Sequence, residues 1–194
     1  MNEPDAISAK RELRAQVRER RAARGVEDRA DAQRGLNAQI GSLLAAGNAK
    51  RIAAFIPTET EPPITHILEK ASLAGVEILL PISRPDRSMD WAPHPVGTPF
   101  EADHLGMPAP VGAIVDPALL QTVDLVLCPA ALVDSKGYRL GWGLGYYDRF
   151  LNSLAHQPPV LAVVFDDEVV DALPHESHDH PVSGAITPSR TIWF

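Results

Sequence analysis

Short apolar runs that alternate with helix-like segments constrain the fold of this chain more than any other feature. The runs stand at residues 51–56, 76–82, 123–128 and 160–165. Segments of helical composition separate the first pair at 64–73 and the second pair at 146–155. Strands that are apolar on both faces and alternate with helices are typical of parallel sheets. We therefore predict an α/β fold of three layers, in which a mainly parallel sheet is flanked by helices.

The N-terminal part of the chain precedes this alternation and has a different composition. Residues 6–46 are rich in Ala, Arg, Glu and Leu, with breaks at Gly25 and Gly47, which predicts two helices joined near 26–28. The 194 residues are 45% hydrophobic and 22% charged, as in one globular domain with a sizeable core. We expect a single domain over 1–194, with the N-terminal helices at about 6–46 and the α/β body at about 50–194.

Residues 83–117 interrupt the alternation with seven prolines, several charges and little periodicity. A short strand at 89–92 is the element that the pattern predicts there. Long excursions of this kind often carry function. The sequence leaves open whether this one closes over a ligand.

Charge and composition narrow the class of partner. The formal net charge of −7 gives no general attraction to phosphate backbones, which argues against nucleic acid. The single cysteine, Cys128, lies in an apolar run, where packing explains it better than nucleophilic catalysis. No segment approaches the roughly 20 apolar residues that span a bilayer. We expect a soluble, cytoplasmic monomer that binds no membrane.

The stretch at 134–148 carries the chemistry. Its glycines, Gly141, Gly143 and Gly145, alternate between a predicted strand and a predicted helix. Glycine backbones approach ligands closely, and N–H groups at a helix start attract phosphate. Arg139 could bind phosphate, and Asp148 could bind Mg²⁺ from the first helical turn. Each feature also has a structural explanation: a turn for the glycines, a solvated surface charge for Arg139, and helix-start electrostatics for Asp148. The Gly-x-Gly-x-Gly spacing matches neither the dinucleotide-binding motif nor the P-loop.

The same stretch resembles the signature of the 5-formyltetrahydrofolate cyclo-ligases, also called methenyltetrahydrofolate synthetases: Gly137-x-Arg139-Leu140-Gly141-x-Gly143-x-Gly145-Tyr146-Tyr147-Asp148-Arg149. The resemblance continues along the chain in Lys10-x-x-x-Arg14, residues 52–61, Leu80-Pro81, Gly106-Met107-Pro108, Leu173-Pro174 and His178-Asp179. It implies an α/β architecture similar to that of sugar-phosphate isomerases and coenzyme A transferases. It also implies ATP-dependent cyclisation of 5-formyltetrahydrofolate, with or without a polyglutamate tail, to 5,10-methenyltetrahydrofolate with release of ADP and phosphate.

The resemblance implies roles for the matching residues. The residues expected to hold ATP are Lys10, Arg14, Arg139, Gly141, Trp142, Gly143, Leu144, Gly145, Tyr146 and Tyr147. Those expected to contact the folate are Ile56, Glu61, Trp142 and Tyr147. Tyr147 and Arg139 would act in the reaction, and Asp148 and Asp179 would bind Mg²⁺. Lys10 and Arg14, four residues apart, would lie on one helix face and present two cations to one polyphosphate.

Four positions depart from the family pattern. Trp142 stands where many relatives have a basic residue, and Leu144 where glycine or lysine is usual. Ala109 stands where an acid is frequent, and Ile64 replaces a threonine near the expected folate pocket. We predict reduced affinity for ATP, a stacking plane at Trp142, and strain at Leu144 if the backbone there has a positive φ.

The implied reaction needs no enzyme nucleophile, because the formyl oxygen would attack the γ-phosphoryl group and nitrogen 10 would then displace phosphate. Catalysis would be positioning and charge neutralisation. Two alternatives stay open: a catalytically impaired relative that binds folate or nucleotide without turnover, and a protein of the isomerase or transferase type. His175, His178 and His180 match no zinc-ligand spacing.

Overall fold

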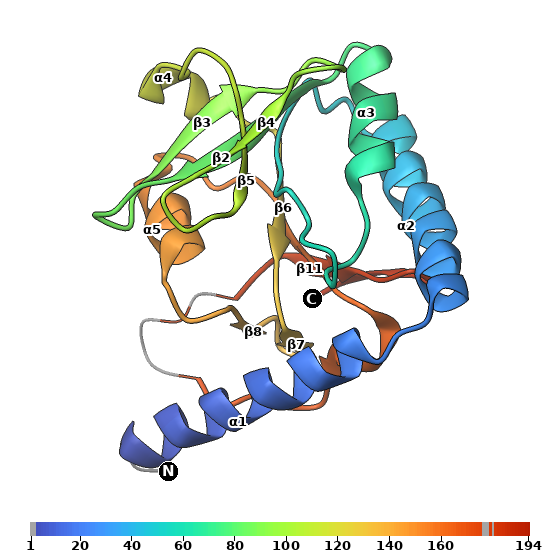
Figure 1. Ribbon diagram of the computed structural model, residues 1–194, viewed down its shortest axis with the longest axis vertical. Coiled ribbons are helices and arrows are strands. Elements are labelled where there is room, and N and C mark those ends of the chain that lie inside the picture. The colour runs from blue at the N-terminus through green and yellow to red at the C-terminus, as the bar shows by residue number, and fades with distance from the viewer. Residues whose placement is uncertain (1–2, 176–178, 180) are drawn as a thin grey trace.

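A seven-stranded sheet forms the centre of the computed structural model, which describes residues 3–175, 179 and 181–194 (Figure 1). Its strands, in spatial order, are β12 (Thr191–Trp193), β11 (Gly184–Ile186), β9 (Val160–Val163), β6 (Leu125–Pro129), β1 (Arg51–Ala53), β2 (Glu77–Ser83) and β3 (Met89–Pro93). The four inner pairings are parallel, and only the edge strands β12 and β3 pair antiparallel to their neighbours. The predicted α/β fold with a mainly parallel sheet flanked by helices is confirmed.

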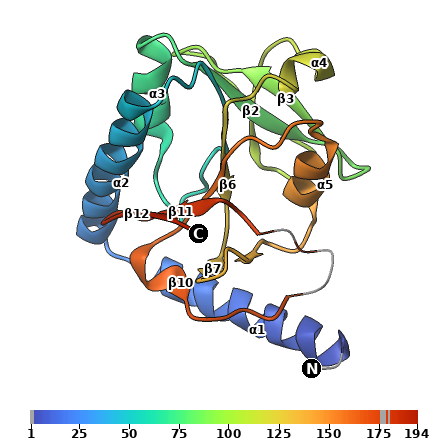
Figure 2. The same cartoon turned by 180° about the vertical axis from the view of Figure 1, so that it is seen from behind.

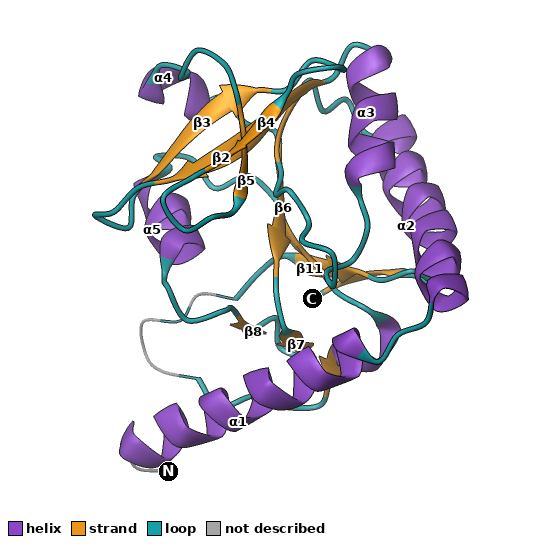
Figure 3. Ribbon diagram, in the orientation of Figure 1, coloured by secondary structure: helices purple, strands orange, loops and turns teal. Residues whose placement is uncertain are grey.

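Helices cover both faces of this sheet (Figure 3). The helices are α1 (Glu3–Ala22), α2 (Val26–Ala46), α3 (Thr65–Leu73), α4 (Pro117–Leu120) and α5 (Tyr146–Ser153). On one face, Leu36 and Ile40 of α2 and Leu68 of α3 pack against the sheet. On the other face, α5 packs through Phe150 and the following Leu154. None of the described helices is long and apolar enough to cross a bilayer.

The two predicted N-terminal helices are present, but they meet at residues 23–25 and not at 26–28. Gly25 caps α2 in an extended conformation, and its N–H donates to the Asp28 carboxylate at 3.3 Å. Gly25 is therefore the last residue of the connection between α1 and α2, and not the first. Neither helix is strongly apolar, so composition located the break only to within a few residues.

α1 lies beside a second, three-stranded sheet near the lower end of the molecule (Figure 2). This sheet contains β10 (Val169–Val170), β7 (Leu132–Asp134) and β8 (Arg139–Leu140), in that order. Val17 of α1 packs against its apolar side chains. The buried Arg21 donates from Nε and Nη2 to the buried Glu168, both at 2.7 Å, and Nη2 also donates to the Ala130 carbonyl at 2.7 Å. Glu168 ends the 3₁₀ helix η1 (Asp166–Glu168), so this ion pair fixes α1 to the body.

The excursion at 83–117 contains more structure than its sequence predicts. The strand expected at 89–92 is β3, one residue longer, and it is followed by an antiparallel hairpin of β4 (Phe100–Ala102) and β5 (Pro108–Pro110). The hairpin was missed because its strands are three residues long, and β5 contains two prolines.

The connections of the central sheet place a crevice between β1 and β6. From β1 the chain passes through α3 to β2 on one side, whereas from β6 it passes through α5 to β9 on the other. The strand order therefore reverses between these two neighbouring parallel strands. Ligands of open α/β sheets bind outside the carboxyl ends of the strands at such a reversal.

Candidate functional site

A cavity of about 550 Å³ lies at the carboxyl ends of β1 and β6. Phe55 and Ile56, which follow β1, and Pro129, which ends β6, line it together with all residues from Gly141 to Asp148. The excursion supplies a further wall through Ser83, Met89, Asp103, Leu105, Met107 and Pro108. Three segments thus meet around one cavity: residues 141–145 (the glycine loop), the loop that follows β1 (the β1 loop) and the excursion at 83–117.

The backbone of the glycine loop needs two of its three glycines. Gly143 and Gly145 have φ values of 94° and 73°, which favour glycine, and Gly145 directly precedes α5. Leu144 is exposed, and Arg87 is the residue other than glycine with positive φ in the described part of the chain. The condition for strain at Leu144 is therefore not met.

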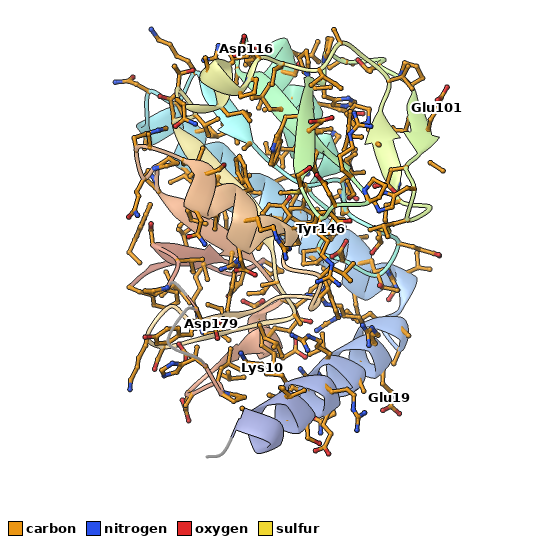
Figure 4. The ribbon with its side chains drawn as sticks, turned by 90° about the vertical axis from the view of Figure 1, so that its left-hand side faces the viewer. Lys10, Glu19, Glu101, Asp116, Tyr146 and Asp179 are labelled. Atoms are coloured by element: carbon orange, nitrogen blue, oxygen red, sulfur yellow. The ribbon has the colours of Figure 1, made fainter. Side chains whose placement is uncertain are left out.

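The cations of α1 reach this loop. Nε of Arg14 donates to the Gly141 carbonyl at 2.7 Å, and a side chain at Gly143 would crowd the Arg14 guanidinium, whose Cζ lies 3.3 Å from an ideal Cβ. Nζ of Lys10 lies 2.9 Å from a carboxylate oxygen of Asp179. Both residues are labelled in Figure 4. Desolvation and the charge of Arg18 lower the pKa of Arg14, which Asp179 opposes. The predicted helix face is therefore directed at the loop and at Asp179.

Arg139 and Asp148 form an ion pair at the other side of the loop. The side chain of Arg139 is only 5% exposed, whereas that of Asp148 is 55% exposed. Desolvation acts to lower the pKa of Arg139, but Cys128, Asp148 and Asp179 outweigh it and raise that pKa. Arg139 is thus a fixed buried cation, and both carboxylates expected to bind metal act on it.

The two adjacent tyrosines point to different partners. The Tyr147 hydroxyl is buried without a hydrogen-bond partner in the part of the chain that the structure describes, and burial raises its pKa well above the usual value. The Tyr146 hydroxyl instead donates to the Arg84 carbonyl at 2.9 Å and lies 3.3 Å from Nε2 of His104. Tyr146 therefore links the excursion to α5, while Tyr147 lines the cavity and has a buried hydroxyl without a partner among the described residues.

Glu61 is occupied by the protein's own donors. Its Oε2 accepts from the N–H of Thr58 at 2.9 Å and from the Thr58 hydroxyl at 3.0 Å. Its Oε1 accepts from the indole N–H of Trp142 at 3.0 Å. Trp142 is the predicted stacking plane, and its ring lies 5.2 Å from the guanidinium carbons of both Arg18 and Arg21. The expected ATP residue Trp142 and the expected folate residue Glu61 are therefore in direct contact.

Comparison with known proteins identifies the family of the chain. The sequence model described as the 5-formyltetrahydrofolate cyclo-ligase family matches residues 6–188. The chain belongs to this family. The 5-formyltetrahydrofolate cyclo-ligase of Mycolicibacterium smegmatis is 33% identical over 150 residues, covering 75% of this chain and 77% of that protein. The enzyme of the same name from Escherichia coli K12 is 28% identical over 153 residues, covering 75% and 81%.

A solved structure shows the same fold. The NMR structure of Aquifex aeolicus 5,10-methenyltetrahydrofolate synthetase superposes with a TM-score of 0.75 at 26% identity, covering 95% of this chain and 92% of that one. The match extends over both the N-terminal helices and the α/β body. The cyclo-ligase signature thus lies in a cyclo-ligase fold.

Two of the departures from the cyclo-ligase pattern lie away from the cavity wall. Ile64 is fully buried in the core between α2, α3 and the sheet, and Ala109 is buried in β5. Cys128 is also fully buried, and desolvation raises its pKa to about 11, in agreement with the packing interpretation. His178 and His180 lie outside the described residues.

Sequence reasoning missed several residues that line this cavity or contact its walls. Arg18 lines the cavity, and its signal was available, because it continues the spacing of four residues set by Lys10 and Arg14. No sequence pattern indicated Thr58 or His104, because their contacts depend on the conformations of the β1 loop and of the excursion.

Proposed function

We propose that the protein is an ATP-dependent 5-formyltetrahydrofolate cyclo-ligase, which releases ADP, phosphate and 5,10-methenyltetrahydrofolate. The observation that carries this proposal is the shared cavity, which joins the cation-flanked glycine loop to Glu61 and to the unpaired Tyr147 hydroxyl. Membership of the family supports the same reaction.

The loop side of the cavity would bind the triphosphate. Arg14 and Arg139 provide cations on two sides of the loop, and Lys10 extends the same face of α1. The glycines from Gly141 to Gly145 let the backbone approach phosphate closely, and the first N–H groups of α5 are free of intrahelical partners. These groups are preorganised in the free protein, so they can stabilise charge on the transferred phosphoryl group without reorganisation.

The β1 side would bind the folate. Ile56 offers apolar contact, and Oε1 of Glu61, which accepts one bond from Trp142, could accept a second from an N–H group of a pterin ring. In the reaction the formyl oxygen attacks the γ-phosphorus and the bond to ADP breaks. Nitrogen 10 then adds to the activated carbon and loses its proton, and phosphate leaves with the former formyl oxygen.

Tyr147 is the residue that we assign to the reacting group. Its hydroxyl is protonated at neutral pH, as in an ordinary tyrosine, and burial raises its pKa further, so it can donate a hydrogen bond. The acceptor would be an oxygen of the formyl or phosphoryl group on which charge develops. An unpaired buried donor that gains a partner only with the ligand favours the bound state.

Mg²⁺ is the metal that the donor set fits. Asp148 and Asp179 are oxygen ligands, and Mg²⁺ is usually held by one or two carboxylates together with phosphates and water. The described residues contain no cluster of three or more such ligands, which suits an ion that arrives with ATP. Mg²⁺ would supply neutralisation of phosphate charge. Asp148 and Asp179 also hold Arg139 and Lys10 in place.

We further propose that the chain is one domain over 1–194, of an architecture like that of sugar-phosphate isomerases and coenzyme A transferases. It would act as a cytoplasmic monomer.

The test combines purified protein with 5-formyltetrahydrofolate, Mg²⁺ and ATP and follows the methenyl product by near-ultraviolet absorption. We expect product only with ATP, and a large loss in Arg139→Ala. Lys136→Ala, which removes an exposed cation outside the cavity lining, is the matched control. Binding of both ligands without product would favour the catalytically impaired relative.

A further inference from the structure

Three cations repeat every four residues along α1: Lys10, Arg14 and Arg18. This spacing places them on one face of the helix. Lys10 contacts Asp179, and Arg14 contacts the Gly141 carbonyl. Arg18 continues the row to the cavity, which it lines.

Among the described residues, Arg18 has no carboxylate partner, unlike Arg20, Arg21 and Arg24 near the end of the same helix. Arg20 and Arg24 pair with Asp167, and Arg21 pairs with Glu168. Within the described residues no carboxylate lies within ion-pair distance of Arg18 or of Arg14. The positive charges of Arg14 and Arg18 also repel each other, since Arg18 lowers the pKa of Arg14. An excess of positive charge therefore faces the glycine loop.

The Trp142 indole holds Arg18 in place. The Arg18 guanidinium carbon lies 5.2 Å from the ring centroid, within the range of a cation–π contact. The ring is itself fixed by its N–H bond to Glu61. Stacking uses the face of a guanidinium and leaves the N–H groups at its edge available for oxygen acceptors. The contact with Trp142 favours one placement of the exposed Arg18 side chain before any ligand binds, which reduces the entropic cost of binding.

The loop lacks a charge of its own at this point. Between Gly141 and Gly145 the intervening residues are Trp142 and Leu144, and neither is basic. We propose that Arg18, stacked on Trp142, supplies this charge and binds phosphate oxygens of the nucleotide. A continuous row of three cations fits a polyphosphate, whose successive charged groups can contact more than one of them. The inference rests on the proposed function in taking ATP as the nucleotide.

The test measures binding without turnover. Calorimetry would follow a non-hydrolysable ATP analogue with Mg²⁺, inorganic tripolyphosphate, and 5-formyltetrahydrofolate, each titrated into wild type and Arg18→Gln. We expect the analogue and tripolyphosphate to bind about tenfold or more weakly to the variant, because hydrogen bonds to charged groups are lost. Binding of 5-formyltetrahydrofolate should be unchanged. Arg11→Gln, which removes an exposed arginine of the same helix outside the cavity lining, should bind all three like wild type.

Two further variants separate phosphate binding from a structural role. Trp142→Phe keeps an aromatic plane and should retain tripolyphosphate affinity, whereas Trp142→Ala removes the plane and should weaken it. Unchanged thermal unfolding of Arg18→Gln would exclude a folding defect as the cause.

Three outcomes would overturn the assignment: equal analogue affinity in wild type and Arg18→Gln, weakening confined to the folate, or no binding of tripolyphosphate by wild type. A result that contradicts the proposed cyclo-ligase activity can be told apart from one that contradicts the role of Arg18. If wild type forms no methenyl product but Arg18→Gln still weakens the analogue, the phosphate role stands without the cyclo-ligase activity.

Discussion

Tyr147 combines a position at the cavity with a buried hydroxyl that has no partner among the described residues. A buried polar group without a partner lowers stability by about 1–3 kcal/mol, so removing this hydroxyl should not destabilise the protein. Its expected use is in the reaction, where a hydrogen bond to developing charge accelerates the chemical step. Stability and activity should therefore respond in opposite directions at this residue.

We predict that Tyr147→Phe leaves the free energy of unfolding unchanged or raises it by about 1 kcal/mol. The same variant should lower kcat about tenfold or more. Urea unfolding and steady-state rates measure the two effects. Tyr146→Phe is the contrasting variant, because it removes an existing hydrogen bond to the Arg84 carbonyl and should lower the free energy of unfolding by about 1 kcal/mol. A loss of stability in Tyr147→Phe would show that its hydroxyl has a partner in the free protein.

Single residues were predictable where the motif itself fixes their place. Arg139, Gly143, Gly145 and Asp148 lie within ten residues of one another, and local spacing was enough to bring them to one loop. The contact between Trp142 and Glu61 joins residues 81 positions apart, and no local pattern encodes it. The sequence therefore identified both residues separately but not the bond between them.

At the level of elements, His94 connects the central sheet to the excursion hairpin. It follows β3 and stacks on Phe100 of β4 with ring centroids 4.9 Å apart. His94 is 4% exposed, and its Nδ1 is buried without a partner in the described part of the chain. Desolvation lowers its pKa, an effect that Glu69 opposes. The folded protein therefore holds His94 neutral.

This shift predicts a loss of stability on acidification. An unfolded histidine has a pKa of about 6.5, so below that pH the unfolded chain binds a proton that folded His94 takes up only at lower pH. Stability should fall as the pH drops through about 6.5 and level off below the lowered pKa of the folded state. The drop in unfolding free energy between pH 7.5 and 5.5 should be smaller in His94→Gln than in wild type. Equal drops would show that His94 does not titrate differently on folding.

Elements were predicted in proportion to their length and apolar content. Four of the five inner strands of the central sheet, β1, β2, β6 and β9, and helices α3 and α5 were found because each lies in a run of apolar or periodic residues. The strands of the small sheet and of the C-terminal edge contain only two or three residues each. Such strands exist because a neighbour pairs with them, and this depends on tertiary context that a single sequence does not display.

At the scale of the whole molecule, the proposed phosphate site is shared between α1 and the α/β body. Among residues 6–22 of α1, only Ala6 and Val17 are buried apolar residues, whereas α2 buries Ala32, Leu36 and Ile40 and also packs Leu43 and Leu44 against the main core. The cations Lys10, Arg14 and Arg18 are thus carried by the helix with fewer buried apolar contacts. Elements with few such contacts open locally at low free energy. A nucleotide that bridges α1 and the loop should therefore stabilise α1 selectively.

This reasoning predicts where ligand protection appears. A non-hydrolysable ATP analogue with Mg²⁺ should slow amide hydrogen exchange in α1 around residues 10–18, while exchange in α2 changes little. Linkage sets the scale, because ligand at 100 times its Kd adds about 2.7 kcal/mol of stability to the bound fold. Hydrogen-exchange mass spectrometry checks the location, and Arg18→Gln at matched saturation should show reduced protection in α1. Protection confined to 141–148, with α1 unchanged, would mean that the nucleotide is held by the loop alone.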